Sequence, residues 1–127
     1  DVVVLDAPGS ATGTIRRHPD LPFAKDGAQF SALFDLQAQL LDHALERMAA
    51  KGRLVYCTCS LLPDEGEAQI ENALQKHSGL RVDHSALDKD FILQEWRVAE
   101  LGLRLRPDFW AEHGGMDGFF ITVLCWA

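Results

Sequence analysis

The stretch DVVVLDAPGS, residues 1–10, decides the fold together with RLVYCTCSLLP, residues 53–63. In each stretch an unbroken apolar run stops at polar and turn-forming residues. Such runs are typical of strands covered on both faces, as in a parallel sheet. We therefore predict strands at residues 2–5 and 53–58.

The residues around these strands predict the other elements. Leu33, Leu36 and Leu40 recur at helical spacing, and they predict a helix that Ser31 caps and that ends near Gly52. Further strands are predicted at residues 80–82, 103–106 and 119–124. The stretch 8–27 is predicted to be mostly loop, and 85–101 stays open between helix and loop.

A second helix follows the strand at 53–58. Asp64 and Glu67 form a capping-box pattern that predicts a helix reaching about His77. The resulting order of strand, helix, strand and helix is the α/β pattern with a parallel sheet. Ligands bind such sheets beyond the carboxyl ends of the strands, so we expect the chemistry within residues 6–13 and 57–64.

Composition limits the possible classes of protein. The chain has 127 residues, of which 47% are hydrophobic and 24% charged, the profile of one globular domain. No apolar run reaches the ~18–20 residues of a membrane span, and we expect no membrane partner. The net charge of −7 argues against binding nucleic acid by bulk electrostatics alone. Three cysteines are too few for a disulfide framework, so we predict a reducing, cytoplasmic location.

Two residues at the predicted strand ends are candidates for chemistry. Cys59 precedes a helix start, where the dipole favours a thiolate, but it also fits a small core residue. Asp6 follows the first strand and is placed either to bind a polar ligand or to cap a turn.

Charged clusters have two interpretations each. Arg16, Arg17 and His18 form the one concentrated basic feature, which fits either phosphate contacts beside the site or a solvated turn. The acidic stretch 64–67 is most simply read as charge that complements a helix N-terminus.

The cysteine spacing does not favour a metal or a disulfide. Cys57 and Cys59 lack a second close pair and the histidines are scattered, so we predict no zinc site. On a regular strand both thiols would point to one face, and residues two apart are poorly placed for an unstrained disulfide. A thiol redox function is therefore the weakest alternative.

Three stretches together resemble one family. Residues 6–20 resemble motif IV of the RNA cytosine-5 methyltransferases of the Sun/NOL/NOP type. Residues 53–63, with Glu65 and Glu67, resemble motif VI, which is centred on Thr-Cys-Ser. Residues 117–120 resemble the late Asp-Gly-Phe-Phe of the family. The three motifs occur in the family's order and span nearly the whole chain.

The resemblance implies an α/β fold, a partial Rossmann-like S-adenosylmethionine-dependent methyltransferase sheet with flanking helices. It implies that Cys59 attacks carbon 6 of cytosine and that Asp6 binds the polar edge of the base. It also places Asp6 and Pro8 beside S-adenosylmethionine. RNA, most simply ribosomal RNA, is the implied substrate, with Arg16, Arg17 and His18 as its contacts.

The chain departs from the family pattern in two ways. Gly9 stands where the family has a second cysteine, which is implicated in product release, so turnover is in doubt. The glycine-rich cofactor loop that precedes motif IV in the family is missing. We therefore expect residues 1–127 to be the C-terminal part of the catalytic domain, inactive alone, and to self-associate through the exposed edge of the first strand. The alternative is a non-catalytic module that binds RNA or protein.

Overall fold

A computed structural model of the chain describes residues 1–21 and 29–127. The strands are β1 (Val2–Asp6), β2 (Arg53–Thr58), β3 (Leu80–Val82), β4 (Arg97–Val98), β5 (Gly102–Leu105) and β6 (Phe119–Trp126). The helices are α2 (Phe30–Arg47), α3 (Glu67–Lys76) and α4 (His84–Leu87). Single 3-10 turns occur at η1 (Thr12–Thr14), η3 (Pro63–Glu65), η4 (Gln94–Trp96) and η5 (Ala111–His113). The predicted loop 8–27 extends into residues 22–28, which lie outside the described part of the chain.

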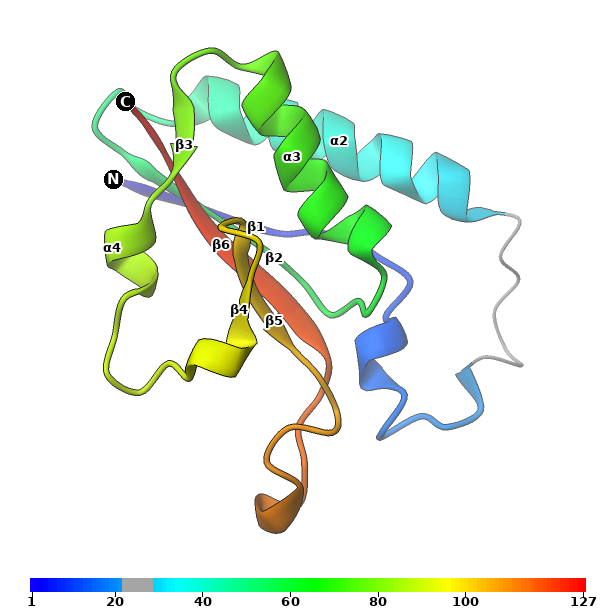
Figure 1. Cartoon of the computed structure of the whole chain (residues 1–127). Coiled ribbons are helices and arrows are strands. Elements are labelled where there is room, and N and C mark those ends of the chain that lie inside the picture. Colours follow the sequence, from blue (N-terminus) through cyan, green and yellow to red (C-terminus); the bar gives the residue numbers. More distant parts are fainter. Residues whose placement is uncertain (22–28) are drawn as a thin grey trace.

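The strands form one mixed sheet in the order β1-β2-β6-β5-β4, with β3 paired to the end of β6 (Figure 1). β1 and β2 are parallel, because the crossover through α2 returns the chain to the same edge. Every other strand pair is antiparallel. The prediction of a parallel sheet is therefore correct for the first pair and wrong for the rest. β6 follows β5 through residues 106–118 without a helical crossover between them, and it enters the sheet antiparallel to both neighbours.

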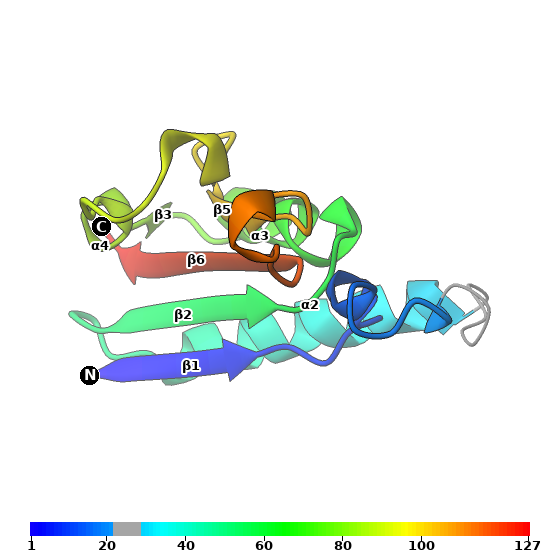
Figure 2. The same cartoon turned by 90° about the horizontal axis from the view of Figure 1, so that it is seen from below.

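One face of the sheet packs against α2 and α3. Leu54 pairs with Leu124 in register, and both side chains are completely buried. Tyr56 and Phe120, on the same face, are also completely buried and pack edge to face. α2 contacts β1, β2 and α3, so these elements share one hydrophobic core. Figures 1 and 2 show the two helices on the same side of the sheet.

The opposite face of β1 is open. Val2 and Val4 are 64% and 65% exposed, and Val55, beside Val4 in the register, is half-buried. Figure 2 shows α2 passing behind β1 and β2, and the described residues place no helix in front of these two strands. The prediction that the first strand is covered on both faces is wrong.

Two predicted helix caps are also wrong. α2 begins at Phe30 with Gln29 as its N-cap, so Ser31 lies inside the helix. α3 begins at Glu67 with Gly66 as its N-cap, and no side chain caps it. The ambiguous stretch 85–101 divides into the end of α4, the turn η4 and the short strand β4.

Candidate functional site

Three loops meet at one edge of the sheet. β1 and β2 are parallel, so the loops that follow them leave from the same edge. β6 is antiparallel to β2, and its first residue, Phe119, therefore lies at that edge as well. This arrangement brings residues 7–18, 59–66 and 117–118 together.

Two backbone hydrogen bonds join these loops. The Gly13 amide donates to the Cys59 carbonyl at 2.8 Å, and the Gly118 amide donates to the Gly13 carbonyl at 2.7 Å. The approach is so close that a Cβ at position 13 would lie 2.0 Å from the Gly118 carbonyl oxygen. A Cβ at position 118 would lie 2.3 Å from Leu61 Cδ2. Glycine is required at both positions, and the junction fixes the backbone of Cys59.

Cys59 differs from Cys57 in its surroundings. β2 ends at Thr58, so Cys59 lies in the bend beyond the strand, and the prediction of two thiols on one strand face is wrong. Cys59 is half-buried. Cys57 is buried, and its thiol donates a long hydrogen bond to the Leu5 carbonyl at 3.8 Å. Burial, and the nearby negative charge of Asp6, raise the pKa of Cys57. Cys57 is thereby held in its protonated form, and Cys59 is the more exposed of the two thiols.

Asp6 and Pro8 lie at the open end of β1. Asp6 is the last residue of the strand and pairs with Cys57 in register, and its Oδ1 lies 3.9 Å from Cys57 Sγ. Both Asp6 and Pro8 are exposed. The chain thus presents an accessible carboxylate at the same edge of the sheet as Cys59.

The basic cluster lies beside the junction. Arg16 and Arg17 both pair with Asp117, at 3.2 and 2.7 Å, and all three side chains are partly exposed. His18 is exposed as well. Part of the positive charge of this cluster is therefore compensated by the residue that precedes Gly118.

Glu65 accompanies motif VI in the family resemblance, but the sequence assigned it no role in the site. It belongs to the acidic stretch 64–67 that was predicted to complement a helix dipole, yet it is completely buried. Its Oε1 accepts from the Ser10 amide at 2.8 Å and from Gln37 Nε2 at 3.0 Å. Its Oε2 accepts from the hydroxyls of Ser10, at 2.7 Å, and Ser60. The simple dipole interpretation is therefore wrong for Glu65.

Glu67 also serves the site rather than a capping box. Its carboxylate receives Arg104 Nε at 2.9 Å and Nη2 at 2.6 Å, and both side chains are largely buried. Arg104 Nη1 donates in addition to the Ser60 carbonyl, and its guanidinium stacks over Phe120 at 5.3 Å. Glu67 is also the first residue of α3, and no local pattern indicates its pairing with Arg104, a strand residue 37 positions away.

Gly9 borders the Glu65 carboxylate. A Cβ at this position would lie 3.0 Å from Glu65 Oε1 and 3.1 Å from Thr58 Oγ1. Among the described residues the buried Thr58 hydroxyl has no hydrogen-bond partner. A larger residue at position 9 therefore requires Glu65 and Thr58 to move by a few tenths of an ångström.

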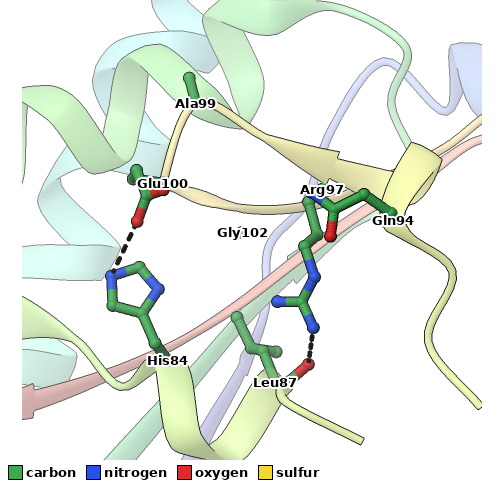
Figure 3. Close-up of a pocket in the computed structure, with 7 residues that line it drawn as sticks. All are labelled: His84, Leu87, Gln94, Arg97, Ala99, Glu100 and Gly102. Atoms are coloured by element: carbon green, nitrogen blue, oxygen red, sulfur yellow. Dashed lines mark hydrogen bonds and ion pairs between the residues drawn. The ribbon is translucent and has the colours of Figure 1, made fainter. Parts of the chain in front are cut away.

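A separate pocket is lined by residues of α4, η4, β4 and β5, at the end of the strand order away from β1 (Figure 3). Leu103, the residue after Gly102, is level with Ile121 of β6 and Cys57 of β2, so the pocket is separated from Cys59 across the strands of the sheet, with β6 between β2 and β5. Within the pocket His84 approaches Glu100 at 3.6 Å, and Arg97 donates to the Leu87 carbonyl at 3.1 Å. These charged groups already have partners, and none of them lies in the stretches that carry the family resemblance.

Two negative findings apply to residues 1–21 and 29–127. No group of three or more histidine, cysteine, aspartate or glutamate side chains is arranged to hold a metal ion in this part of the chain. Within the same residues, no helix has the length and apolar character needed to cross a membrane.

Comparisons with known proteins agree with this arrangement. The profile of a family described as 16S rRNA methyltransferase RsmB/F matches residues 1–125. The chain is 36% identical over 124 residues to ribosomal RNA small subunit methyltransferase B of Shewanella oneidensis. It is 44% identical over 124 residues to the protein of the same name from Photorhabdus laumondii. Each alignment covers 98% of this chain and 26% of the relative.

Solved structures share the fold. A methyltransferase homologue from Pyrococcus horikoshii superposes with a TM-score of 0.72 at 28% identity, over 100% of this chain and 39% of that one. NSun6 from the same organism, solved with SFG, gives a TM-score of 0.73 at 24% identity, over 97% of this chain and 29% of that one. The second likeness shows the fold alone.

Proposed function

The chain belongs to the 16S rRNA methyltransferase RsmB/F family, and from this premise we propose that it carries the nucleophile of an S-adenosylmethionine-dependent enzyme that methylates carbon 5 of cytosine in ribosomal RNA. The chain spans 26% of the length of the curated relatives it matches. We place it in the C-terminal part of the catalytic domain, and activity is therefore proposed for the full gene product that contains these residues.

The junction of the three loops is the observation that carries this proposal. It joins the stretches of residues 6–20, 53–63 and 117–120, which carry the family resemblance, through the backbone of Gly13. Cys59 lies at its centre with partial access to solvent, whereas Cys57 is buried and held as a thiol. The arrangement presents one cysteine to a substrate at the open edge of the sheet.

The proposed chemistry uses Cys59 as a covalent nucleophile. Carbon 5 of cytosine is a poor nucleophile, and addition of the Cys59 thiolate to carbon 6 converts the ring to an enamine that is nucleophilic at carbon 5. Asp6 is proposed to bind the polar edge of the base and to support the shift of charge into the ring. After methylation a base removes the proton from carbon 5, and the electron pair of that bond expels the Cys59 thiolate.

Asp6 and Pro8 are the residues proposed to face the cofactor. The exposed Asp6 carboxylate at the end of β1 suits a positively charged ligand, and Pro8 offers an apolar surface next to it. When bound, S-adenosylmethionine supplies the methyl group that carbon 5 accepts.

The basic cluster is proposed to contact phosphates of the RNA. Arg16, Arg17 and His18 are exposed beside the junction, which suits contacts that position the backbone of a nucleic acid. Asp117 occupies both guanidinium groups in the free protein, so phosphate must compete with this carboxylate.

Product release requires a group other than residue 9. The family pattern has a cysteine at this position, and glycine supplies no acid, base or nucleophile. Gly9 therefore favours the alternative that the protein is a non-catalytic module that binds RNA or a protein partner.

Covalent trapping distinguishes the two functions. The full gene product is incubated with S-adenosylmethionine and RNA that carries 5-fluorocytosine, which blocks removal of the group at carbon 5. We expect an adduct with the unmodified protein and with the control Cys125→Ser, because Cys125 is buried on β6 near the end opposite the loop edge. Cys59→Ser should form none. Absence of an adduct from the unmodified protein would favour the non-catalytic module.

A further inference from the structure

We propose that Glu65 is a positioning residue that aims Cys59 at its substrate by locking together the loops after β1 and β2. The inference rests on the proposed function only in naming that substrate. Glu65 itself is completely buried and touches neither RNA nor cofactor. Its effect must pass through the residues that it holds.

The Glu65 carboxylate crosslinks three separate segments. Its hydrogen bonds reach Ser10 in the loop after β1, Ser60 in the loop after β2 and Gln37 on α2. Gln37 donates to the Pro8 carbonyl at 2.7 Å as well, which ties the same loop a second time. Four donors converge on one carboxylate, and an amide at this position would direct an N–H group at some of them.

Ser60, the residue after Cys59, is held from two sides. Glu65 accepts its hydroxyl, and Arg104 donates to its carbonyl. The Cys59 carbonyl is fixed in turn by the Gly13 amide. The backbone on both sides of the Cys59–Ser60 peptide is thus constrained, and the Glu65 carboxylate links Ser60 directly to Ser10 in the loop after β1.

Glu65 has a rigid support of its own. Tyr56 is completely buried, and its hydroxyl donates to the Glu65 carbonyl at 2.6 Å. Burial, and the negative charge of Glu65, raise the pKa of Tyr56, so this donor keeps its proton. The turn η3 that presents Glu65 is therefore anchored to the strand that ends just before Cys59.

Loss of the carboxylate has a specific expected consequence. Without its acceptor, the loop with Ser60 loosens from the loop with Ser10, and Cys59 becomes more accessible but less well aimed. RNA binding is unaffected, because Glu65 is buried. The expected signature is faster labelling of Cys59 by a small reagent together with slower attack on a bound base.

The experiment compares Glu65→Gln with Leu124→Ala, a core variant whose site lies toward the other end of the sheet. In the full gene product, Glu65→Gln should slow formation of the 5-fluorocytosine adduct within the bound complex about 10- to 100-fold and leave the dissociation constant for RNA unchanged. Iodoacetamide, followed by peptide mass spectrometry, should label Cys59 about threefold faster or more, with Cys125 unchanged. In the Leu124→Ala variant, labelling of Cys59 should not become faster relative to labelling of Cys125.

The labelling decides the inference even if the proposed function fails. If the unmodified protein forms no adduct, the methyltransferase proposal falls, and selective acceleration at Cys59 alone supports positioning by Glu65. If Glu65→Gln leaves the labelling rate of Cys59 unchanged, or raises the rates of Cys59 and Cys125 equally, the inference that Glu65 positions Cys59 is overturned. If Glu65→Gln does not fold, Ser60→Ala, which removes one of the four donors, is judged by the same comparison.

Discussion

Replacing Gly13 by alanine tests whether the loop junction is packed as tightly as its geometry indicates. The new Cβ would lie 2.0 Å from the Gly118 carbonyl oxygen, 2.6 Å from the Gly118 carbonyl carbon and 2.8 Å from the Cys59 carbonyl oxygen. All three contacts are with backbone atoms, which cannot rotate away as the end of a side chain can. The loops must separate to admit the methyl group.

The cost follows from two contributions. Overpacking of a tight site costs about 1–3 kcal/mol. Separation also breaks the hydrogen bonds from Gly13 to Cys59 and from Gly118 to Gly13, at about 1 kcal/mol each. We therefore expect Gly13→Ala to lower the free energy of unfolding by about 3–5 kcal/mol, a large part of the roughly 5–15 kcal/mol typical of a domain.

Urea unfolding, followed by tryptophan fluorescence, measures this difference. The matched control is Gly79→Ala, because Gly79 has a positive φ of 86° but no atom within 4 Å of the added Cβ. The control carries only the cost of the left-handed backbone, about 1–2 kcal/mol. A Gly13→Ala chain as stable as the Gly79→Ala chain would show that the loops are not in contact as described.

Two further variants test the surface of the fold. Partial burial raises the pKa of Asp42, but the hydrogen bonds from Lys76 and His77 outweigh it and hold this pKa below its ordinary value of 3.8. The stability that they supply is therefore present above about pH 4 and is lost as the pH falls through the lowered pKa. Asp42→Asn should therefore be less stable than the unmodified chain in urea at about pH 6, and its deficit should shrink as the pH is lowered through the depressed pKa; a deficit that does not change with pH would contradict the pairing. Val2 and Val4 on the edge strand β1 should drive self-association, which Val4→Lys should suppress in light scattering. A strictly monomeric unmodified chain at high concentration would count against this surface.

Local patterns predicted most elements but not the direction of the strands. Continuous apolar runs identified β1 and β2, and leucine spacing identified α2, because each depends only on neighbours along the chain. The strand order instead depends on β6, which inserts between β2 and β5. Nothing within residues 119–124 distinguishes a parallel from an antiparallel partner, because a buried central strand is apolar in both cases.

The same limit applies to exposure. The run Val2–Leu5 has the composition of a strand covered on both faces, yet only the face toward α2 is covered in the described residues. An apolar composition indicates that a surface is favoured to be buried, but it does not indicate which part of a protein covers that surface. The resemblance implied the free edge of β1, whereas its apolar composition could not say which of its faces the described residues would leave open.

The acidic stretch 64–67 shows why the site was only partly predicted. Cys59 and Asp6 could be proposed as candidates because a residue's position after a strand is a local property. Glu65 and Glu67 fit a common local pattern, acidic residues at a helix start, which accounts for them without any distant partner. Their actual partners, Ser10 and Arg104, lie 55 and 37 positions away along the chain. A buried carboxylate is costly unless it is fully hydrogen-bonded. A glutamate that only complemented a helix N-terminus would therefore lie at the surface. Its burial beneath four donors indicates instead that these acidic residues stabilise the loop that carries Cys59.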